Sequence, residues 1–153
     1  MVEIANRLVT DAISARGRAL RPPRTVFISR SRADSRIGDQ LAKALTARGL
    51  QPVLGDDVIN SVRTTEASID DAIRSADVVA VLWSGNYAQS PWCYDELVLA
   101  VERETSGAAR VWLFNLDGSQ IVPRAARRLP QIVTRTAAEI VAALDDFLAS
   151  GGG

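Results

Sequence analysis

The sequence contains no histidine and a single cysteine, Cys93. Without histidine, catalytic groupings of the Ser-His-Asp and Cys-His types are excluded, as are zinc sites built on histidine. Any acid–base or electrostatic catalysis must therefore come from aspartate, glutamate, lysine, tyrosine or arginine. One cysteine cannot form a disulfide within the chain and is typical of a reducing compartment, so we expect a cytoplasmic protein.

Long hydrophobic runs and an excess of one charge are also missing. No apolar stretch approaches the ~20 residues of a membrane span, and the first residues lack the apolar region of a signal peptide. Eighteen basic side chains balance eighteen acidic ones, so we expect no direct nucleic-acid or membrane partner, although a local basic patch is not excluded. With 153 residues, 47% of them hydrophobic, the chain suits one domain with a real core.

Several nucleotide-binding and phosphorylation motifs are absent. The chain has no G-x-x-x-x-G-K-[ST] sequence and no G-x-G-x-x-G after its first predicted strand, which argues against a P-loop and against a dinucleotide-cofactor site of that type. A response-regulator receiver would need acidic residues after the first strand and an aspartate at the end of the third. Those places hold "SRSR" (29–32) and "WSG" (83–85), which argues against that class too.

The residues that are present alternate between predicted strands and predicted helices. Short apolar runs predict strands, and apolar residues at helical spacing predict helices. Residues 1–20 also have helical spacing, and the prolines of "RPPR" (21–24) end that helix. Residues 85–90 are predicted to be a loop, and residues 117–130 to be mostly irregular with a short helix near 123–128. The predicted strands are 24–31, 50–57, 76–84, 110–116 and 131–135, and the further helices are 34–48, 64–75, 90–104 and 136–148.

This alternation predicts an open parallel sheet with helices on both faces. In such folds, ligands bind beyond the carboxyl ends of the strands. The loops at those ends begin near Ser29, Gly55, Ser84 and Leu116. Residues close to these four positions are therefore the first candidates for a functional site.

One helix start, "SPWCYDEL" (90–97), carries the residues with the most chemical potential. Ser90 and Pro91 suit the cap and first position of a helix. Trp92 and Glu96 lie four residues apart and so share one face, while Asp95 is turned away by about 100°. Burial raises the pKa of a carboxyl group and a helix N-terminus lowers it, so the two effects oppose each other at Glu96. The alternative is an ordinary solvated carboxylate. Cys93 has no base partner and is interpreted as a small buried apolar residue.

Three stretches together resemble the TIR (Toll/interleukin-1 receptor) domain, in its bacterial type. They are "VFISRSRAD" (26–34), "GDDV" (55–58) and the segment 68–97, in which S-x-x-Y-x-x-S-x-W-C-x-x-E-L (84–97) is the most specific part. The resemblance implies a flavodoxin-like three-layer α/β sandwich. Its five-stranded parallel sheet would have the order 2-1-3-4-5.

The resemblance covers residues 24–149 and divides the chain into three parts. Residues 1–23 would be an N-terminal helix with a proline linker. Residues 150–153 would be a glycine tail or a truncated linker.

Many bacterial and plant TIR domains cleave NAD+ at the nicotinamide–ribose bond, whereas others only assemble with further TIR domains. The resemblance implies that Glu96 is the catalytic glutamate and that NAD+ is the substrate, with no cofactor and no metal. The product would be ADP-ribose or a cyclic ADP-ribose. It further implies self-association, a fused or separate sensor domain, and a role in immune or antiphage signalling. The alternative is a non-catalytic adaptor.

The residue chemistry is compatible with this reaction. The nicotinamide of NAD+ is cationic and leaves as a neutral molecule, so one carboxylate can suffice, by stabilising the charge that develops at ribose C1′. Each candidate substrate-binding residue has a structural alternative as a core, capping or surface residue. Trp92 could stack on a flat ring, and arginines could pair with the pyrophosphate. The full candidate set is Ser29, Arg30, Arg32, Asp56, Asp57, Ser84, Tyr87 and Trp92.

Two features depart from the family pattern. Arg30 follows F-I-S where an aromatic residue is common, and the loop at 58–65 lacks the usual glycine or proline. Because that loop often takes part in substrate access and self-association, the departure favours the adaptor alternative, whereas Glu96 and Trp92 favour the enzyme.

Overall fold

The computed structural model describes residues 23–55, 65–122 and 124–151 of the chain. Some of the sequence-based predictions lie outside these residues and are not addressed by the structure. They are the helix at 1–20, Asp56, Asp57 and most of the loop at 58–65.

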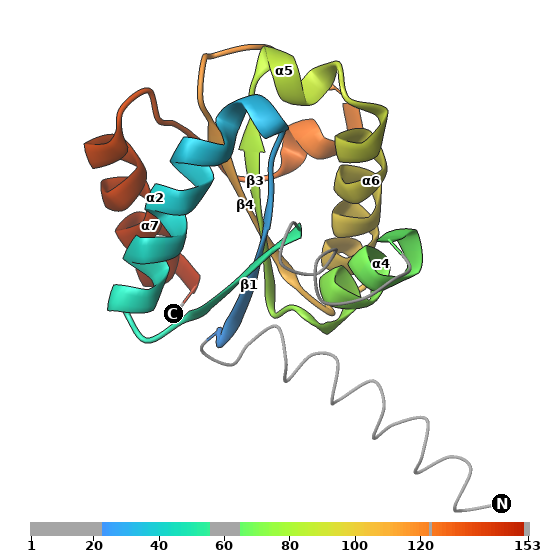
Figure 1. Cartoon of the computed structure of the whole chain (residues 1–153), viewed down its shortest axis with the longest axis horizontal. Coiled ribbons are helices and arrows are strands. Elements are labelled where there is room, and N and C mark those ends of the chain that lie inside the picture. The colour runs from blue at the N-terminus through green and yellow to red at the C-terminus, as the bar shows by residue number, and fades with distance from the viewer. Residues whose placement is uncertain (1–22, 56–64, 123, 152–153) are drawn as a thin grey trace, which may run out of the picture.

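The centre of the fold is a parallel sheet of five strands in the order β2-β1-β3-β4-β5 (Figure 1). This order and the parallel direction of every strand pair confirm the predicted sheet. The strands are shorter than the apolar runs that predicted them. They are β1 (Thr25–Ser29), β2 (Gln51–Leu54), β3 (Val78–Trp83), β4 (Arg110–Asn115) and β5 (Gln131–Val133).

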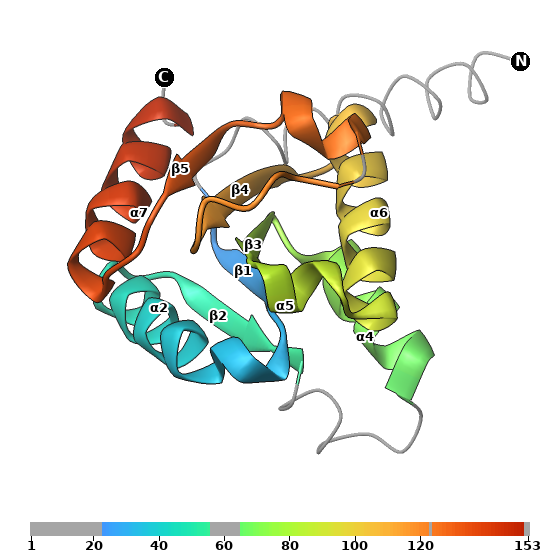
Figure 2. The ribbon, with the colours of Figure 1, turned by 90° about the horizontal axis from the view of Figure 1, so that it is seen from above.

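Helices cover both faces of the sheet, as predicted. Seen from above in Figure 2, α2 (Ser35–Ala47) and α7 (Ala137–Gly151) lie on one side, and α4 (Thr65–Ser75) and α6 (Pro91–Thr105) on the other. None of the helices within the described residues is long and apolar enough to cross a membrane. The remaining short elements are η1 (Arg32–Asp34), α5 (Gly85–Ala88) and η2 (Arg124–Arg128).

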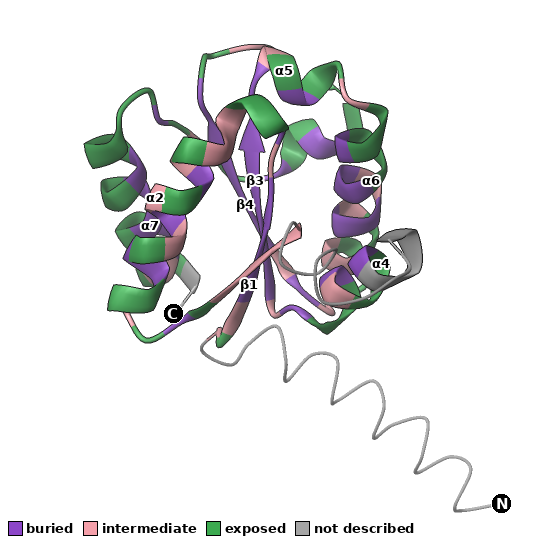
Figure 3. Ribbon diagram, in the orientation of Figure 1, coloured by how far each residue is buried: buried purple, intermediate pink, exposed green. Residues whose placement is uncertain are grey.

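Strand β3 explains why the sheet is buried on both faces (Figure 3). All six of its residues are buried. Val79, Val81 and Trp83 belong to the cluster under α4 and α6, whereas Val78, Ala80 and Leu82 belong to the cluster under α2 and α7. Successive side chains of a strand point to opposite faces, so a central strand without polar residues requires a helical layer on each side.

The structure corrects two of the predicted boundaries. Residues 85–90 were predicted to be a loop, but Gly85–Ala88 form the short helix α5. Its N-cap is Ser84, whose side chain accepts a hydrogen bond from the backbone N–H of Tyr87. A helix of four residues is too short to show a hydrophobic period, which is why the pattern missed it. At the other end of the chain, α7 continues to Gly151, beyond the predicted helix end at 148. Near 123–128 the predicted short helix is confirmed as η2.

Asp77 ties the start of β1 to the start of β3. Its Oδ2 accepts hydrogen bonds from the backbone N–H groups of Arg24 at 2.9 Å and Thr25 at 3.2 Å. The Asp77 N–H in turn donates to Thr25 Oγ1 at 3.1 Å. These bonds fix the relative register of two central strands at their amino ends.

We therefore expect Asp77→Ala to lower the free energy of unfolding by about 1–3 kcal/mol, because it leaves the partly buried N–H of Thr25 without its acceptor. Urea denaturation followed by circular dichroism measures the change. Asp39→Ala, at an exposed position of α2, is the control and should not destabilise the protein. Equal stability of the Asp77→Ala variant and the unmodified chain would contradict the role given to Asp77.

Candidate active site

The first turns of α6 position the two residues that the sequence analysis ranked highest. Ser90 Oγ accepts a hydrogen bond from the Cys93 N–H at 3.2 Å, and Pro91 occupies the first helical position. This start places Trp92 and Glu96 on the same side of α6. The Trp92 side chain is 40% exposed, whereas Glu96 is only 8% exposed.

Two buried hydroxyl groups hold the Glu96 carboxyl. Ser29 Oγ, at the carboxyl end of β1, donates to Glu96 Oε2 at 2.5 Å. The Tyr87 hydroxyl of α5 lies 2.8 Å from the same Ser29 Oγ. Because serine has a single hydroxyl proton and donates it to Glu96, Tyr87 is the donor to Ser29 when Glu96 is ionised. The carboxyl is thus fixed by residues from a strand and from a second helix.

Burial raises the pKa of Glu96 from its usual 4.5 to about 7. Hydrogen bonds from Ser29 and Trp92 and the positive charge of Arg30 act against this rise, and the negative charge of Asp70 adds to it. Burial therefore affects the pKa of Glu96 more than these stabilising contacts do. The pKa of Tyr87 is also raised well above its usual value, chiefly by burial, so its phenol keeps the proton that it donates.

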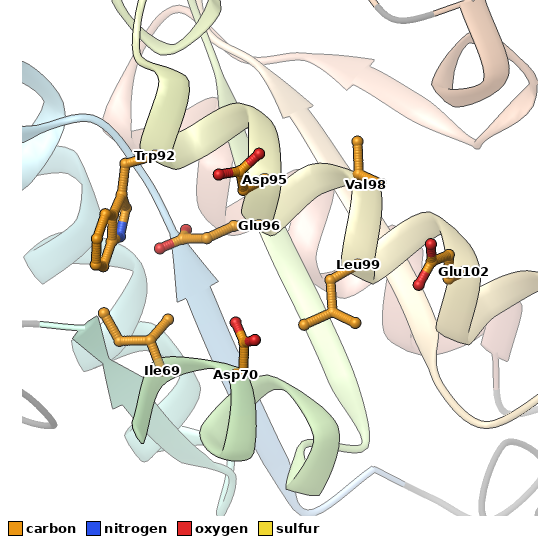
Figure 4. Close-up of a pocket in the computed structure, with 8 residues that line it drawn as sticks. All are labelled: Ile69, Asp70, Trp92, Asp95, Glu96, Val98, Leu99 and Glu102. Atoms are coloured by element: carbon orange, nitrogen blue, oxygen red, sulfur yellow. The ribbon is translucent and has the colours of Figure 1, made fainter. Parts of the chain in front are cut away.

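Glu96 and Trp92 lie in the wall of a cleft of about 310 Å³ between α4 and α6 (Figure 4). In Figure 4 the indole of Trp92 and the carboxyl of Glu96 point to the same space above α4. Asp95 is exposed and also lines the cleft, so the predicted turn away from the Trp92 face does not remove it from the site. The lining residues are Ile69, Asp70, Trp92, Asp95, Glu96, Val98, Leu99 and Glu102.

The other predicted site residues have different positions. Ser29 is completely buried, so its polar contacts are with Glu96 and Tyr87. Tyr87 is 1% exposed and packs against Trp83 with the ring centroids 5.4 Å apart. Ser84 caps α5 and donates to Asp34 Oδ2 at 2.7 Å. These three residues are buried beneath the site and are not among the residues that line the cleft.

The two arginines after β1 also differ from each other. Arg30 is half-buried and close enough to Glu96 for its charge to lower the pKa of that carboxyl. A β-carbon at Gly38 would lie 2.7 Å from Arg30 Cδ, so this glycine leaves room for the arginine against α2. Arg32 is exposed in η1 and is not among the residues that line the cleft.

Sequence reasoning missed Asp70 of α4 and Asp34 of η1. Asp70 lines the cleft opposite α6, and its only sequence signal is its place in the predicted helix 64–75. Asp34 Oδ2 accepts hydrogen bonds from Ser31 at 2.8 Å and Ser84 at 2.7 Å, which joins the loop after β1 to α5. Cys93, by contrast, is buried as predicted, and burial raises the pKa of its thiol to about 11, which makes it a poor nucleophile.

Comparisons with known proteins place this arrangement in context. A sequence model described as "TIR domain" matches residues 26–147. An uncharacterized protein, y4lF, of Sinorhizobium fredii is 37% identical over 91 residues, and the disease resistance protein LAZ5 of Arabidopsis thaliana is 32% identical over 100 residues. The matched parts cover 57% and 63% of this chain but only 28% and 8% of these curated relatives.

Two solved structures share the fold. A CMP N-glycosidase of Clostridium botulinum, BcmB, superposes with a TM-score of 0.60 at 14% identity, covering 80% of this chain and 98% of that one. The TIR domains of the activated Roq1 resistosome superpose with a TM-score of 0.55 at 22% identity, covering 82% of this chain and 71% of that one.

The first testable consequence of the site geometry concerns the Ser29 hydrogen bond. Ser29→Ala removes a donor to the ionised carboxylate, so the pKa of Glu96 should rise above about 7. Carbon-13 NMR of labelled glutamate carboxyl groups measures this titration. Tyr87→Phe, which leaves the Ser29 donor in place, should cause a smaller rise. A lower or unchanged pKa in Ser29→Ala would contradict the assigned contact.

A second consequence concerns stability and pH. The folded-state pKa of Glu96 is raised from 4.5 to about 7, so its protonated form favours the folded state below pH 4.5, and this contribution is lost as the pH rises towards 7. Glu96→Gln cannot ionise. The variant should therefore gain about 2–3 kcal/mol in the free energy of unfolding, relative to the unmodified chain, between pH 4.5 and pH 8. Denaturant titrations across this range measure the gain, with Asp95→Asn as the exposed control.

Proposed function

This chain belongs to the TIR-domain family, and we propose that it is an NAD+ glycohydrolase that breaks the bond between nicotinamide and ribose. The observation that carries the proposal is Glu96, a buried carboxyl group with a pKa of about 7, in the wall of a cleft that also presents the exposed Trp92 indole. The products are nicotinamide and either ADP-ribose or a cyclic ADP-ribose.

The proposed reaction follows from the charges of the substrate. As the C1′–N bond breaks, its electron pair stays on the ring nitrogen, which turns cationic nicotinamide into a neutral leaving group. Positive charge then develops at ribose C1′, and the ionised Glu96 stabilises it at short range from its buried position in the wall of the cleft. Water adds to C1′ and loses a proton in the hydrolytic version, and an adenine nitrogen takes its place in the cyclising version. NAD+ is the substrate, and the reaction requires no metal and no cofactor.

Each supporting residue has a role in this scheme. Ser29 donates to Glu96 Oε2 and is itself held by the Tyr87 hydroxyl, so these two residues orient the carboxyl. Trp92 offers an aromatic face on which the nicotinamide or adenine ring can stack. Arg30, whose charge already acts on Glu96, is the arginine better placed to meet the pyrophosphate. Only the ionised form of Glu96 is productive, so the rate of nicotinamide release rises as the pH increases through about 7.

Cleavage of a neutral nucleotide is a second candidate. The structural neighbour from Clostridium botulinum is a CMP N-glycosidase. A neutral pyrimidine leaves with an extra electron pair and so benefits from an acid. The raised pKa keeps a large share of Glu96 protonated near neutral pH, which would supply that acid. This activity would fall with increasing pH, opposite to the trend for NAD+, so the pH profile distinguishes the two substrates.

We further propose that the activity depends on self-association through TIR–TIR contacts and that the protein acts in cytoplasmic immune or antiphage signalling. The similarity to a plant disease resistance protein and to the TIR domains of a resistosome supports this role. A fused or separate sensor domain would supply the trigger.

The direct test is nicotinamide release from NAD+ by concentrated protein, followed by chromatography. Glu96→Gln should lower kcat by at least about 100-fold, because it removes the charge that stabilises the ribosyl cation. Asp71→Asn, an equal loss of charge at an exposed position of α4, is the control and should keep the activity. Folded protein in both variants is verified by thermal unfolding.

Three outcomes would change the proposal. Absence of both nicotinamide release from NAD+ and cytosine release from CMP by the assembled protein would leave the non-catalytic adaptor as the function. Nicotinamide release that continues unchanged in Glu96→Gln would mean that Glu96 is not the catalytic residue. Release of cytosine from CMP, with no release of nicotinamide, would assign the protein to neutral nucleotides instead.

A further inference from the structure

The cleft has a strongly one-sided charge. Among the described residues, eight line the cleft; four of them carry carboxyl groups, namely Asp70, Asp95, Glu96 and Glu102, and none of these eight is basic. The other lining residues are Trp92 and the aliphatic side chains of Ile69, Val98 and Leu99. A surface of this composition attracts a flat cation, since a cation gains from the carboxylates and from the face of the indole.

Asp70 is the acidic residue that faces Glu96 from the other side. It comes from α4, whereas the other three come from α6, and Figure 4 shows its carboxyl directed from α4 towards that of Glu96. The negative charge of Asp70 also adds to the raised pKa of Glu96, although burial of Glu96 is the largest cause. The neighbouring Ile69 is 2% exposed and packs in the core, so the position of Asp70 at the cleft is set by the packing of α4.

We propose that Asp70 is a specificity-determining residue that restricts the cleft to nucleotides whose base carries a permanent positive charge, such as pyridinium N-glycosides. This inference rests on the proposed function and deepens it. A cationic ring placed between α4 and α6 pairs with Asp70 on one side, while Glu96 faces the ribose on the other. A neutral pyrimidine base gains nothing from Asp70, and a phosphate at this place is repelled.

Charge loss during the reaction gives Asp70 and Glu96 different kinetic effects. The ring is cationic in the bound substrate and neutral once the C1′–N bond has broken. Asp70 therefore stabilises the bound substrate more than the transition state, whereas Glu96 stabilises the transition state. Asp70→Asn should raise KM for NAD+ about fivefold to tenfold without lowering kcat. The same charge loss weakens the hold of the cleft on the neutral product and so favours its release.

A metal ion is the alternative occupant for a cleft lined with carboxylates. Among the residues that the structure describes, no group of three or more acidic, histidine or cysteine side chains is arranged to hold a metal ion. The spread of the carboxyl groups along α6 and their separation across the cleft suit a larger, organic cation.

The experiment compares two ring probes that differ in charge: 1-methylnicotinamide, which is permanently cationic, and nicotinamide, which is neutral. Each is titrated into the full chain, and the indole N–H signal of Trp92 is followed by nitrogen-15 NMR. The unmodified chain should bind the cation more tightly. Asp70→Asn should reduce the ratio of the two affinities about fivefold or more. Asp70→Glu, which restores the charge, should recover most of it.

The matched control is Asp71→Asn. Asp71 is the next residue of α4, is exposed, and is not among the residues that line the cleft, so this variant has the same net charge as Asp70→Asn and should change the ratio less than about twofold. An equal loss in both variants would mean that the cleft responds to overall charge, and would overturn the proposal. An equal loss of affinity for both probes in Asp70→Asn would also overturn it. Asp70 would then affect the shape of the cleft and not its preference for a cation.

The probe titration is independent of turnover, so the two proposals can fail separately. The protein could prefer the cationic probe in a way that depends on Asp70 and yet release no nicotinamide from NAD+. That result would support the role of Asp70 and contradict the proposed glycohydrolase activity. Nicotinamide release with an unchanged probe preference in Asp70→Asn would do the reverse. Absence of binding of either probe to the unmodified chain would overturn the inference about Asp70.

Discussion

The hydrogen bond between Ser29 and Glu96 is the interaction on which the site depends. It joins the carboxyl end of β1 to the second turn of α6, across 67 positions of sequence. The Tyr87 hydroxyl of α5 completes the group from a third element. A carboxyl group that is 8% exposed is tolerated because these contacts replace water. The same burial raises its pKa to about 7, so the chemistry of Glu96 is a product of the packing of α6 on the sheet.

Burial and function are therefore linked through the hydrophobic layer under α4 and α6. Cys93 and Leu97 anchor α6 in that layer, and Ile69 and Ile73 anchor α4. The cleft is the space left between the two helices above this layer, where the side chains turn polar. Because both helices are fixed by the same core, the carboxylates of α4 and α6 meet across the cleft without any direct bond between them. Packing sets their distance, and their shared charge sets the kind of ligand that the cleft attracts.

Local sequence patterns predicted strands and helices correctly where the pattern extends over many residues. The apolar run at 76–84 predicted strand β3, and Ser90 with Pro91 predicted the start of α6. Thr136 caps the start of α7, where the sequence predicts a helix from 136, since the Glu139 N–H donates to Thr136 Oγ1 at 3.2 Å. The pattern failed at α5, where four residues are too few for a period. It also could not separate Arg30, whose charge reaches Glu96, from Arg32, which lies exposed in η1.

The sequence by itself determined the alternation of strands and helices, the family resemblance, and the single glutamate on the Trp92 face of α6. These features depend on residue spacing within one element, and helices and strands have fixed side-chain periods that can be recognised in a sequence. Only the tertiary structure decided that Ser29, supported by Tyr87, holds Glu96, that burial outweighs the Ser29 and Trp92 hydrogen bonds in setting its pKa, and that Asp70 faces it. The physical reason is that desolvation and contacts between elements depend on which surfaces pack together. Residue spacing along the chain does not indicate which surfaces those are.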